Sequence, residues 1–236
     1  ARIAGPRLAG PVQDEREGLR FLRSLHNVLN HHLAAVIGPA LPGDWQARFP
    51  GPHRGAISGH TGETAWKPTW LHRRVHEIRP RTVCEVGFNA GHSAAAMLAA
   101  APGARYFGFD ADLHGAGANA QLFELLRAAL LGRNHMHMTW GWSPAAPARF
   151  LMETRGGVYC DVVFLDAMHD RKHVLEEVRL FRAFSGLVVV DDVDLPAVGS
   201  AWRELVAGGE LWELQCGTGE TRNEHCFGGE GQGELQ

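Results

Sequence analysis

Apolar residues near the N-terminus recur at the spacing of a helix. Between residues 13 and 37 they follow one another at three or four positions, as in Leu22, Leu25 and Leu29, up to Gly38-Pro39. This pattern predicts an amphipathic helix that ends at the Gly-Pro pair. Residues 38–62 are rich in proline and glycine and predict an irregular connection. We expect residues 1–62 to form a helix and a Pro/Gly-rich segment that together serve as a lid or as a dimer contact.

From residue 82 onward, short apolar runs alternate with segments of helical periodicity. The apolar runs predict strands over 82–86, 105–109, 135–139, 161–165, 187–190 and 211–215. Helices are expected over 69–78, 93–100, 119–131, 172–183 and 197–206, with one more that includes 150–154. Such strands separated by helices are typical of a parallel sheet covered on both faces. The sequence therefore predicts one α/β domain over 63–227 and a disordered, Gly- and Glu-rich tail over 228–236.

The composition is that of a globular protein with a sizeable core. The 236 residues are 45% hydrophobic and 21% charged, with a net charge of −3. This charge indicates neither a nucleic-acid partner nor a membrane surface, and no apolar run reaches the roughly 18–20 residues of a membrane span. No two of the four cysteines form a C-x-x-C pair. We expect reduced thiols in a cytoplasmic protein, with Cys216–Cys226 as an alternative disulfide.

A turn with two glycines lies between the first predicted strand and its helix. Glycine allows a positive φ and a close backbone approach to a ligand, and the helix that follows directs N–H groups into the turn. The turn therefore predicts a nucleotide or nucleoside site at Glu85, Gly87, Asn89, Gly91 and Ser93. A dinucleotide fingerprint would need glycine at Asn89 and at His92, and no Walker lysine follows. An ordinary strand-to-helix turn remains the alternative.

The next two strands end in residues that suit the rest of a nucleoside. Asp110 ends the second strand, 23 positions after Gly87 (110 − 87), where a carboxylate can accept both ribose hydroxyls. Gly141, Trp142 and Ser143 follow the third strand. A small residue leaves room for an adenine, on which Trp142 could pack and to which Ser143 could donate. The alternatives are that Asp110 caps a turn and that Trp142 belongs to the core.

Three carboxylates follow the fourth and fifth strands. Asp166 ends one strand, and Asp191 and Asp192 end the other, at the edge of the sheet where ligands bind. Their mutual repulsion predicts a cation among them, and Mg²⁺ prefers such oxygen ligands. His169 lies three residues beyond Asp166 and is the candidate general base. The alternative is that these aspartates only cap the following turns.

These motifs together resemble those of class I methyltransferases. The E-x-G-x-x-x-G turn is similar to their first motif, and residues 59 to about 196 resemble the catechol O-methyltransferase group in the same order. The resemblance implies a Rossmann-like, seven-stranded, mostly parallel sheet with its last strand antiparallel, and S-adenosylmethionine as cofactor. It also implies that Asp166, Asp191 and Asp192 hold Mg²⁺ and that His169 replaces the catalytic lysine of that group.

The resemblance leaves the acceptor open. Asp192 stands where the catechol O-methyltransferase group often has Asn. An Asp at this position resembles the metal-dependent sugar and macrolide O-methyltransferases. We expect an O-methyltransferase that modifies a hydroxyl of a small molecule, with catalysis at His169 and Asp166 and with a homodimer as one option. Three alternatives remain: a metal-independent N- or O-methyltransferase, a silent nucleoside-binding module, and a nicotinamide-dependent oxidoreductase.

Overall fold

The computed structural model describes residues 15–32, 66–113, 117–130, 135–218 and 224–229. They fall into two compact units. The strand unit comprises 80–87, 106–111 and 137–236, and the helix unit comprises the remaining residues up to 136. The expected irregular connection over 38–62, the domain boundary at 62/63 and the tail beyond 229 lie outside the described residues.

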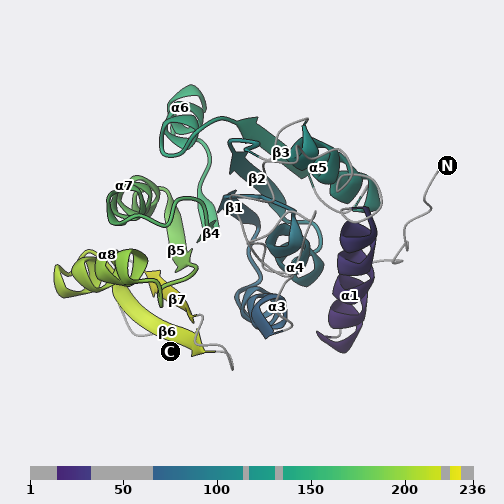
Figure 1. The fold of residues 1–236 in the computed structure, drawn as a ribbon, viewed down its shortest axis with the longest axis horizontal. Helices are drawn as coiled ribbons and strands as arrows, with labels where there is room; N and C mark the ends of the chain where they lie inside the picture. The colour runs from purple at the N-terminus through teal and green to yellow at the C-terminus, as the bar shows by residue number, and fades with distance from the viewer. Residues whose placement is uncertain (1–14, 33–65, 114–116, 131–134, 219–223, 230–236) are drawn as a thin grey trace, which may run out of the picture. The chain divides into compact units, whose positions relative to one another are not determined.

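The sheet contains the strands β1 (Thr82–Val86), β2 (Arg105–Asp110), β3 (His135–Trp140), β4 (Cys160–Leu165), β5 (Ser185–Val190), β6 (Trp212–Thr218) and β7 (Glu224–Gly229). They form a seven-stranded sheet in the order β3-β2-β1-β4-β5-β7-β6 (Figure 1). The strands β1, β4 and β5 pair in parallel, and β7 runs antiparallel to both β5 and β6. The prediction of a Rossmann-like α/β fold with a parallel sheet is confirmed.

Among the described residues, the strand unit contains the helices α6 (Ala145–Glu153), α7 (Arg171–Arg182) and α8 (Pro196–Ala207). Helix α7 packs on β4, β5 and α8. Val174, Val178 and Phe181 of α7 and Leu205 of α8 lie in the core of this unit. Apolar residues on one face of each helix therefore hold both helices on the sheet.

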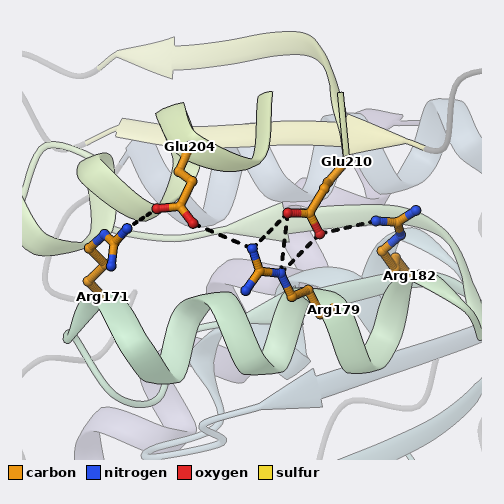
Figure 2. Close-up of polar contacts among 5 residues, drawn as sticks. All are labelled: Arg171, Arg179, Arg182, Glu204 and Glu210. Carbon is orange, nitrogen blue, oxygen red and sulfur yellow. Dashed lines mark hydrogen bonds and ion pairs between the residues drawn. The ribbon is translucent and has the colours of Figure 1, made fainter. Parts of the chain in front are cut away.

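An ionic network also joins α7 to the C-terminal end of α8 (Figure 2). The Arg179 guanidinium donates to both carboxylate oxygens of Glu210 at 2.7 and 3.0 Å, and to Glu204 at 3.4 Å. Arg182 donates to Glu210 at 3.2 Å, and Arg171 donates to Glu204. Three arginines of one helix thus share two glutamates of the neighbouring segment.

The helix unit contains α1 (Glu15–His32), α3 (Trp66–Ile78), α4 (His92–Ala100) and α5 (Ala118–Ala129). Helix α1 packs on α3, α4 and α5. Asn30 Oδ1 of α1 lies 2.8 Å from Nε2 of the fully buried His92, and His26 Nε2 of α1 lies 3.0 Å from the His92 carbonyl oxygen, so polar contacts also join α1 to α4. No helix of the described residues is long and apolar enough to cross a membrane.

Two expectations about the chain are wrong. Reduced thiols were expected, but Cys84 pairs with Cys160 and Cys216 pairs with Cys226. Cys84 and Cys160 lie on the neighbouring strands β1 and β4, with Cα atoms 5.7 Å apart, which suits a disulfide. The predicted tail also begins too early, because Gly228 and Gly229 belong to β7 and pair with β5 and β6.

Candidate functional site

The strands β1, β4 and β5 end level with one another. Val86 pairs with Leu165, and Leu165 pairs with Val190. Beyond these pairs, the Asp166 amide donates to the carbonyl of Val86 at 2.8 Å, and the Asp191 amide donates to Leu165 at 3.0 Å. The sheet order places β1 beside β4, so the strand order reverses between them, where open α/β sheets bind ligands.

The other side of β1 continues the same edge. The Gly87 amide donates to the carbonyl of Phe109 at 2.8 Å, and the Gly141 amide donates to the carbonyl of Asp110 at 2.8 Å. The strand unit therefore brings together, at the carboxyl edge of one sheet, the predicted residues Gly87, Asp110, Gly141, Asp166 and Asp191.

Gly87 must be glycine for a reason that the sequence alone did not show. Its φ is +94°, and a Cβ at this position would lie 1.9 Å from the carbonyl oxygen of Asp166. The constraint therefore comes from the backbone of β4. A close approach of a cofactor, which the sequence suggested, would add to this constraint.

The turn after β3 is fixed at both ends. Gly141 has a φ of +148°, and the Ala146 amide donates to the carbonyl of Trp142 at 2.8 Å. Trp142 is 56% exposed, so it is not a core residue. The hydroxyl oxygen of Ser143 is buried. The Gly141 amide joins this turn to the end of β2, and the exposed Trp142 follows directly; its role toward an adenine stays a prediction.

The remaining residues of the glycine turn belong to the helix unit. Asn89 and Gly91 both have a positive φ, of 48° and 79°. A Cβ on Gly91 would lie 2.6 Å from the Phe88 ring, and the Gly91 amide donates to the Phe88 carbonyl at 2.8 Å. Gly91 precedes α4, in whose first turn Ser93 is buried. These residues form the helix N-terminus that the sequence predicted.

Glu85 lies inside the strand unit and is fully buried. The hydroxyl of Tyr106 donates to its carboxylate. Burial and the adjacent Glu85 carboxylate raise the pKa of Tyr106 well above its ordinary value, so Tyr106 stays a donor. The structure therefore gives Glu85 a partner within the core, and its role toward a cofactor stays a prediction.

Two aspartates and a histidine form a cluster at the ends of β4 and β5. His169 Nε2 lies 3.3 Å from Asp166 Oδ1 and 3.2 Å from Asp192 Oδ2. Asp192 has a φ of +54°, and its amide donates to Asp191 Oδ1 at 2.6 Å. The cluster therefore contains Asp166, His169 and Asp192, whereas the predicted metal set had Asp191 in place of His169.

The electrostatics of this cluster are dominated by burial and by repulsion. Burial, followed by the neighbouring Asp191, raises the pKa of Asp166 well above its ordinary value, while His169 opposes the rise. Hydrogen bonds to Asp166 and to Asp192 raise the pKa of His169 to about 10. His169 therefore keeps its proton to a higher pH than a free imidazole does.

The donor set of the cluster fits a divalent cation. One ligand atom from each of Asp166, His169 and Asp192 lies within 4.8 Å of the others. Carboxylate oxygens suit Mg²⁺ and Mn²⁺, and an imidazole nitrogen suits the later transition metals. Asp191 is close enough to raise the pKa of Asp166 and adds negative charge to the site.

The sequence reasoning missed one polar residue of this unit. Glu177 of α7 is 1% exposed, although it is charged in water at neutral pH. It lies three positions after Val174 and four before Phe181, on the buried face of the helix. The helical spacing of α7 contained this signal, because it places a carboxylate in the apolar face.

Comparison with known families identifies the segment that carries this site. Residues 84–193 match a family described as "Methyltransferase domain". The matched segment runs from β1 past β5. It contains the predicted residues of the glycine turn, Asp110 and the acidic cluster. A comparison with curated proteins gives no match.

Solved structures with the same fold cover most of the chain. An O-methyltransferase from Bacillus cereus in complex with SAH is 15% identical, with a TM-score of 0.59 over 87% of this chain and 89% of its own. The O-methyltransferase TomG from Streptomyces achromogenes, involved in tomaymycin synthesis and in complex with SAM, is 18% identical, with a TM-score of 0.54 over 88% and 97%.

A third solved structure is similar over nearly its whole length. CalS11, a TDP-rhamnose 3′-O-methyltransferase of calicheamicin biosynthesis, is 17% identical, with a TM-score of 0.55 over 95% of this chain and 97% of its own. At these identities the likenesses show the fold. The family match over residues 84–193 confirms the resemblance to methyltransferases that the motifs indicated.

Proposed function

Starting from the methyltransferase domain in residues 84–193, we propose that the protein is an S-adenosylmethionine-dependent O-methyltransferase for a small-molecule hydroxyl. Two observations support this proposal: Asp110 ends β2 at the carboxyl edge of the sheet, where a carboxylate can accept from ribose hydroxyls, and the exposed Trp142 follows Gly141, whose amide donates to the Asp110 carbonyl. The three solved structures with this fold are named O-methyltransferases, and two of them contain SAM or SAH.

We further propose that catalysis uses a divalent cation such as Mg²⁺. The observation that supports it best is the cluster of Asp166, His169 and Asp192 at the same edge of the sheet as Asp110. Asp166 and Asp192 would hold the ion, and Asp191 would add negative charge. Such an ion binds a hydroxyl oxygen and lowers its pKa.

The residues of the chain have distinct parts in the proposed reaction. The carboxylate of Asp110 would accept hydrogen bonds from the ribose hydroxyls of the cofactor and so help to orient it. Because the sulfonium methyl group of the cofactor is already reactive, transfer depends mainly on the orientation of the acceptor oxygen. His169 can accept the hydroxyl proton only when its imidazole is neutral. The proposal therefore requires that other positive charge replaces the imidazolium between Asp166 and Asp192.

A metal-independent methyltransferase is the second candidate, and one observation favours it. The imidazolium of His169 already contacts both Asp166 and Asp192, at 3.3 and 3.2 Å. This arrangement offsets part of the repulsion between the carboxylates without a metal ion. His169 would then orient the acceptor by donating a hydrogen bond, and the aspartates would keep the imidazole charged.

Methyl transfer in the presence and absence of metal separates the two candidates. Protein freed of metal with EDTA is assayed for SAH formation with S-adenosylmethionine and a panel of phenols, catechols and sugar alcohols. We expect activity to vanish in EDTA and to return with Mg²⁺. Asp166→Asn should be inactive under both conditions, while Asp194→Asn, which changes an exposed carboxylate nearby, should be active. Full activity in EDTA would favour the metal-independent enzyme.

A further inference from the structure

Two cysteines and a glutamate come together on the paired strands β6 and β7. Cys216 and Cys226 lie directly opposite each other on these antiparallel strands, with Cα atoms 4.1 Å apart, and their sulfur atoms form a disulfide. A carboxylate oxygen of Glu213 lies within 4.8 Å of both sulfur atoms. Thiolate sulfur and carboxylate oxygen are both ligands that zinc accepts in proteins.

A β-bulge in β6 brings Glu213 to the same face as the cysteines. Residues three apart in a regular strand point to opposite faces of the sheet, which would separate Glu213 from Cys216. In β6, however, the register shifts between Glu213 and Gln215. The residues opposite Glu213 and Cys216 are therefore Gly228 and Cys226, which are only two positions apart in β7. Residues directly opposite share a face, so all three side chains lie on one face.

Trp202 of α8 holds the carboxylate of Glu213 in this place. Its indole Nε1 donates to Glu213 Oε2 at 2.6 Å, and Trp202 is 3% exposed. A Cβ on Gly228 would lie 2.9 Å from the Trp202 ring, so glycine at this position makes room for the ring. Carboxylates that bind metal ions are commonly oriented by such a hydrogen bond from a neighbouring group.

The disulfide and a metal ion exclude each other at this site. The thiolate of a small thiol attacks one sulfur and breaks the S–S bond, and a second thiol then displaces the first. The reductant leaves as its own disulfide, and Cys216 and Cys226 are left as two thiols. A zinc ion that binds both sulfur atoms displaces their two protons. Without a cation, two thiolates beside the Glu213 carboxylate would repel one another.

We propose that Cys216, Cys226 and Glu213 bind a zinc ion when their disulfide is reduced, with a water molecule as the fourth ligand. Two thiolates on a tetrahedral zinc ion lie about 3.8 Å apart. Opposite residues of paired strands have Cβ atoms about 4.5–5.5 Å apart, so the sulfur atoms can reach that distance while β6 and β7 stay paired. The zinc ion then joins β6 to β7, as the disulfide does in the oxidised protein. The proposed methyl transfer uses none of these residues.

Titration of the reduced protein with Co²⁺ tests the proposal. A mild thiol is applied without oxygen and then removed, and mass spectrometry after alkylation shows which cysteines are free. We expect thiolate-to-cobalt charge-transfer absorption and the visible bands of a tetrahedral ion, both abolished when Zn²⁺ displaces Co²⁺. The acidic cluster of Asp166, His169 and Asp192 has no sulfur ligand and cannot give the charge-transfer absorption. The oxidised protein should not give it either.

Variants assign the ligands. Cys216→Ser and Cys226→Ser should each lose most of the charge-transfer absorption and bind Zn²⁺ at least 100-fold more weakly, on the order of a lost ligand. Glu213→Gln should keep the absorption, because both thiolates remain, but should bind Zn²⁺ roughly 10- to 100-fold more weakly. Trp202→Phe should weaken binding about tenfold, since the carboxylate loses its hydrogen bond. Glu176→Gln, which changes an exposed carboxylate of α7, is the matched control and should bind as wild type does.

Three results would overturn the proposal. One is reduced wild-type protein that shows no more charge-transfer absorption than Cys216→Ser, which also covers the case in which the mild thiol opens Cys84–Cys160. Another is wild-type affinity for Zn²⁺ in Glu213→Gln, because the site would then be a cysteine pair alone. The third is a Cys216–Cys226 disulfide that stays closed in every reductant in which the protein remains folded. Binding of S-adenosylhomocysteine, measured on the same samples, tests the proposed function separately.

Discussion

A Cβ on Gly87 would lie 1.9 Å from the carbonyl oxygen of Asp166. Gly87→Ala must therefore separate the ends of β1 and β4 as well as adopt a φ of +94°. We expect a loss of about 3 kcal/mol or more in the free energy of unfolding, from the combined cost of strain and overpacking. Chemical denaturation followed by circular dichroism measures this loss, and binding of S-adenosylmethionine should be lost too.

Gly117→Ala is the control for Gly87→Ala. Gly117 also has a positive φ, of +66°, but a Cβ there would have nothing within 4 Å. It should cost only the roughly 1–2 kcal/mol of the left-handed conformation. Equal losses in the two variants would mean that the contact with β4 is not the constraint at Gly87.

The ribose position gives the second prediction. Asp110→Ala should weaken the binding of S-adenosylmethionine by roughly 2–4 kcal/mol, because charged hydrogen bonds to two hydroxyls are lost. Asp110→Asn keeps one acceptor oxygen and should lose less. Calorimetry at one pH measures both variants. Wild-type affinity in a folded Asp110→Ala protein would remove Asp110 from the cofactor site.

Much of the sheet edge could be predicted because its signals are local. An apolar run followed by an acidic residue places Asp110, Asp166 and Asp191 at strand ends, and parallel strands end at one edge. The level ends of β1, β4 and β5 bear this out. The glycine turn was equally visible, since glycines between a strand and a helix suit a positive φ.

Some features could not be predicted from the sequence, because they depend on which strands are neighbours in the sheet or on a strand with a weak apolar pattern. The Cys84–Cys160 disulfide follows from the contact of β1 with β4, which are separated by 76 positions. Gly228 and Gly229 end strand β7 and were predicted as part of the tail because glycine gives little strand signal, yet pairing on both sides holds β7 in the sheet. The burial of Glu177 likewise depends on which strands α7 covers.

The disulfides give the third prediction. Cys216 is half-buried, whereas Cys84 and Cys160 are fully buried, so a mild reductant should open Cys216–Cys226 first. Alkylation of the folded protein followed by mass spectrometry reports the order. Reduction of both should lower the melting temperature, and Cys84–Cys160 should account for more of the loss. Loop closure gives roughly 4–5 kcal/mol for Cys84–Cys160 and about 3 for Cys216–Cys226.

The ionic network of Figure 2 gives the fourth prediction. Hydrogen bonds from Arg179 lower the pKa of Glu210 below its ordinary value of 4.5. Because folding lowers this pKa, ionised Glu210 stabilises the folded state above pH 4.5. This stabilisation is lost as the pH falls through the lower pKa that Glu210 has in the folded protein. Because these side chains face solvent, Glu210→Gln should cost no more than about 1 kcal/mol at pH 7. The cost should shrink in 1 M salt and near pH 3, in contrast to a packing defect.

His169 gives the last prediction, which begins with the stability of the metal-free protein. Its pKa rises from 6.5 in the unfolded chain to about 10 in the folded protein. Because folding raises this pKa, protonated His169 stabilises the folded state fully below pH 6.5, and this stabilisation is lost as the pH rises toward 10. In EDTA, the stability difference between wild type and His169→Ala should therefore shrink from pH 6 to pH 10. His173→Ala, which leaves Asp166 and Asp192 unchanged, should not reproduce this trend.

The same proton should be released when metal binds. At pH 8 His169 is protonated in the metal-free protein, and a cation held by Asp166 and Asp192 removes the reason for its high pKa. Mg²⁺ titrations in buffers with different ionisation enthalpies should report the release of about one proton in wild type. Affinity for Mg²⁺ should therefore rise with pH in the wild-type protein. An observed binding heat that does not depend on the buffer would mean that His169 keeps its proton, and it could then not serve as the base.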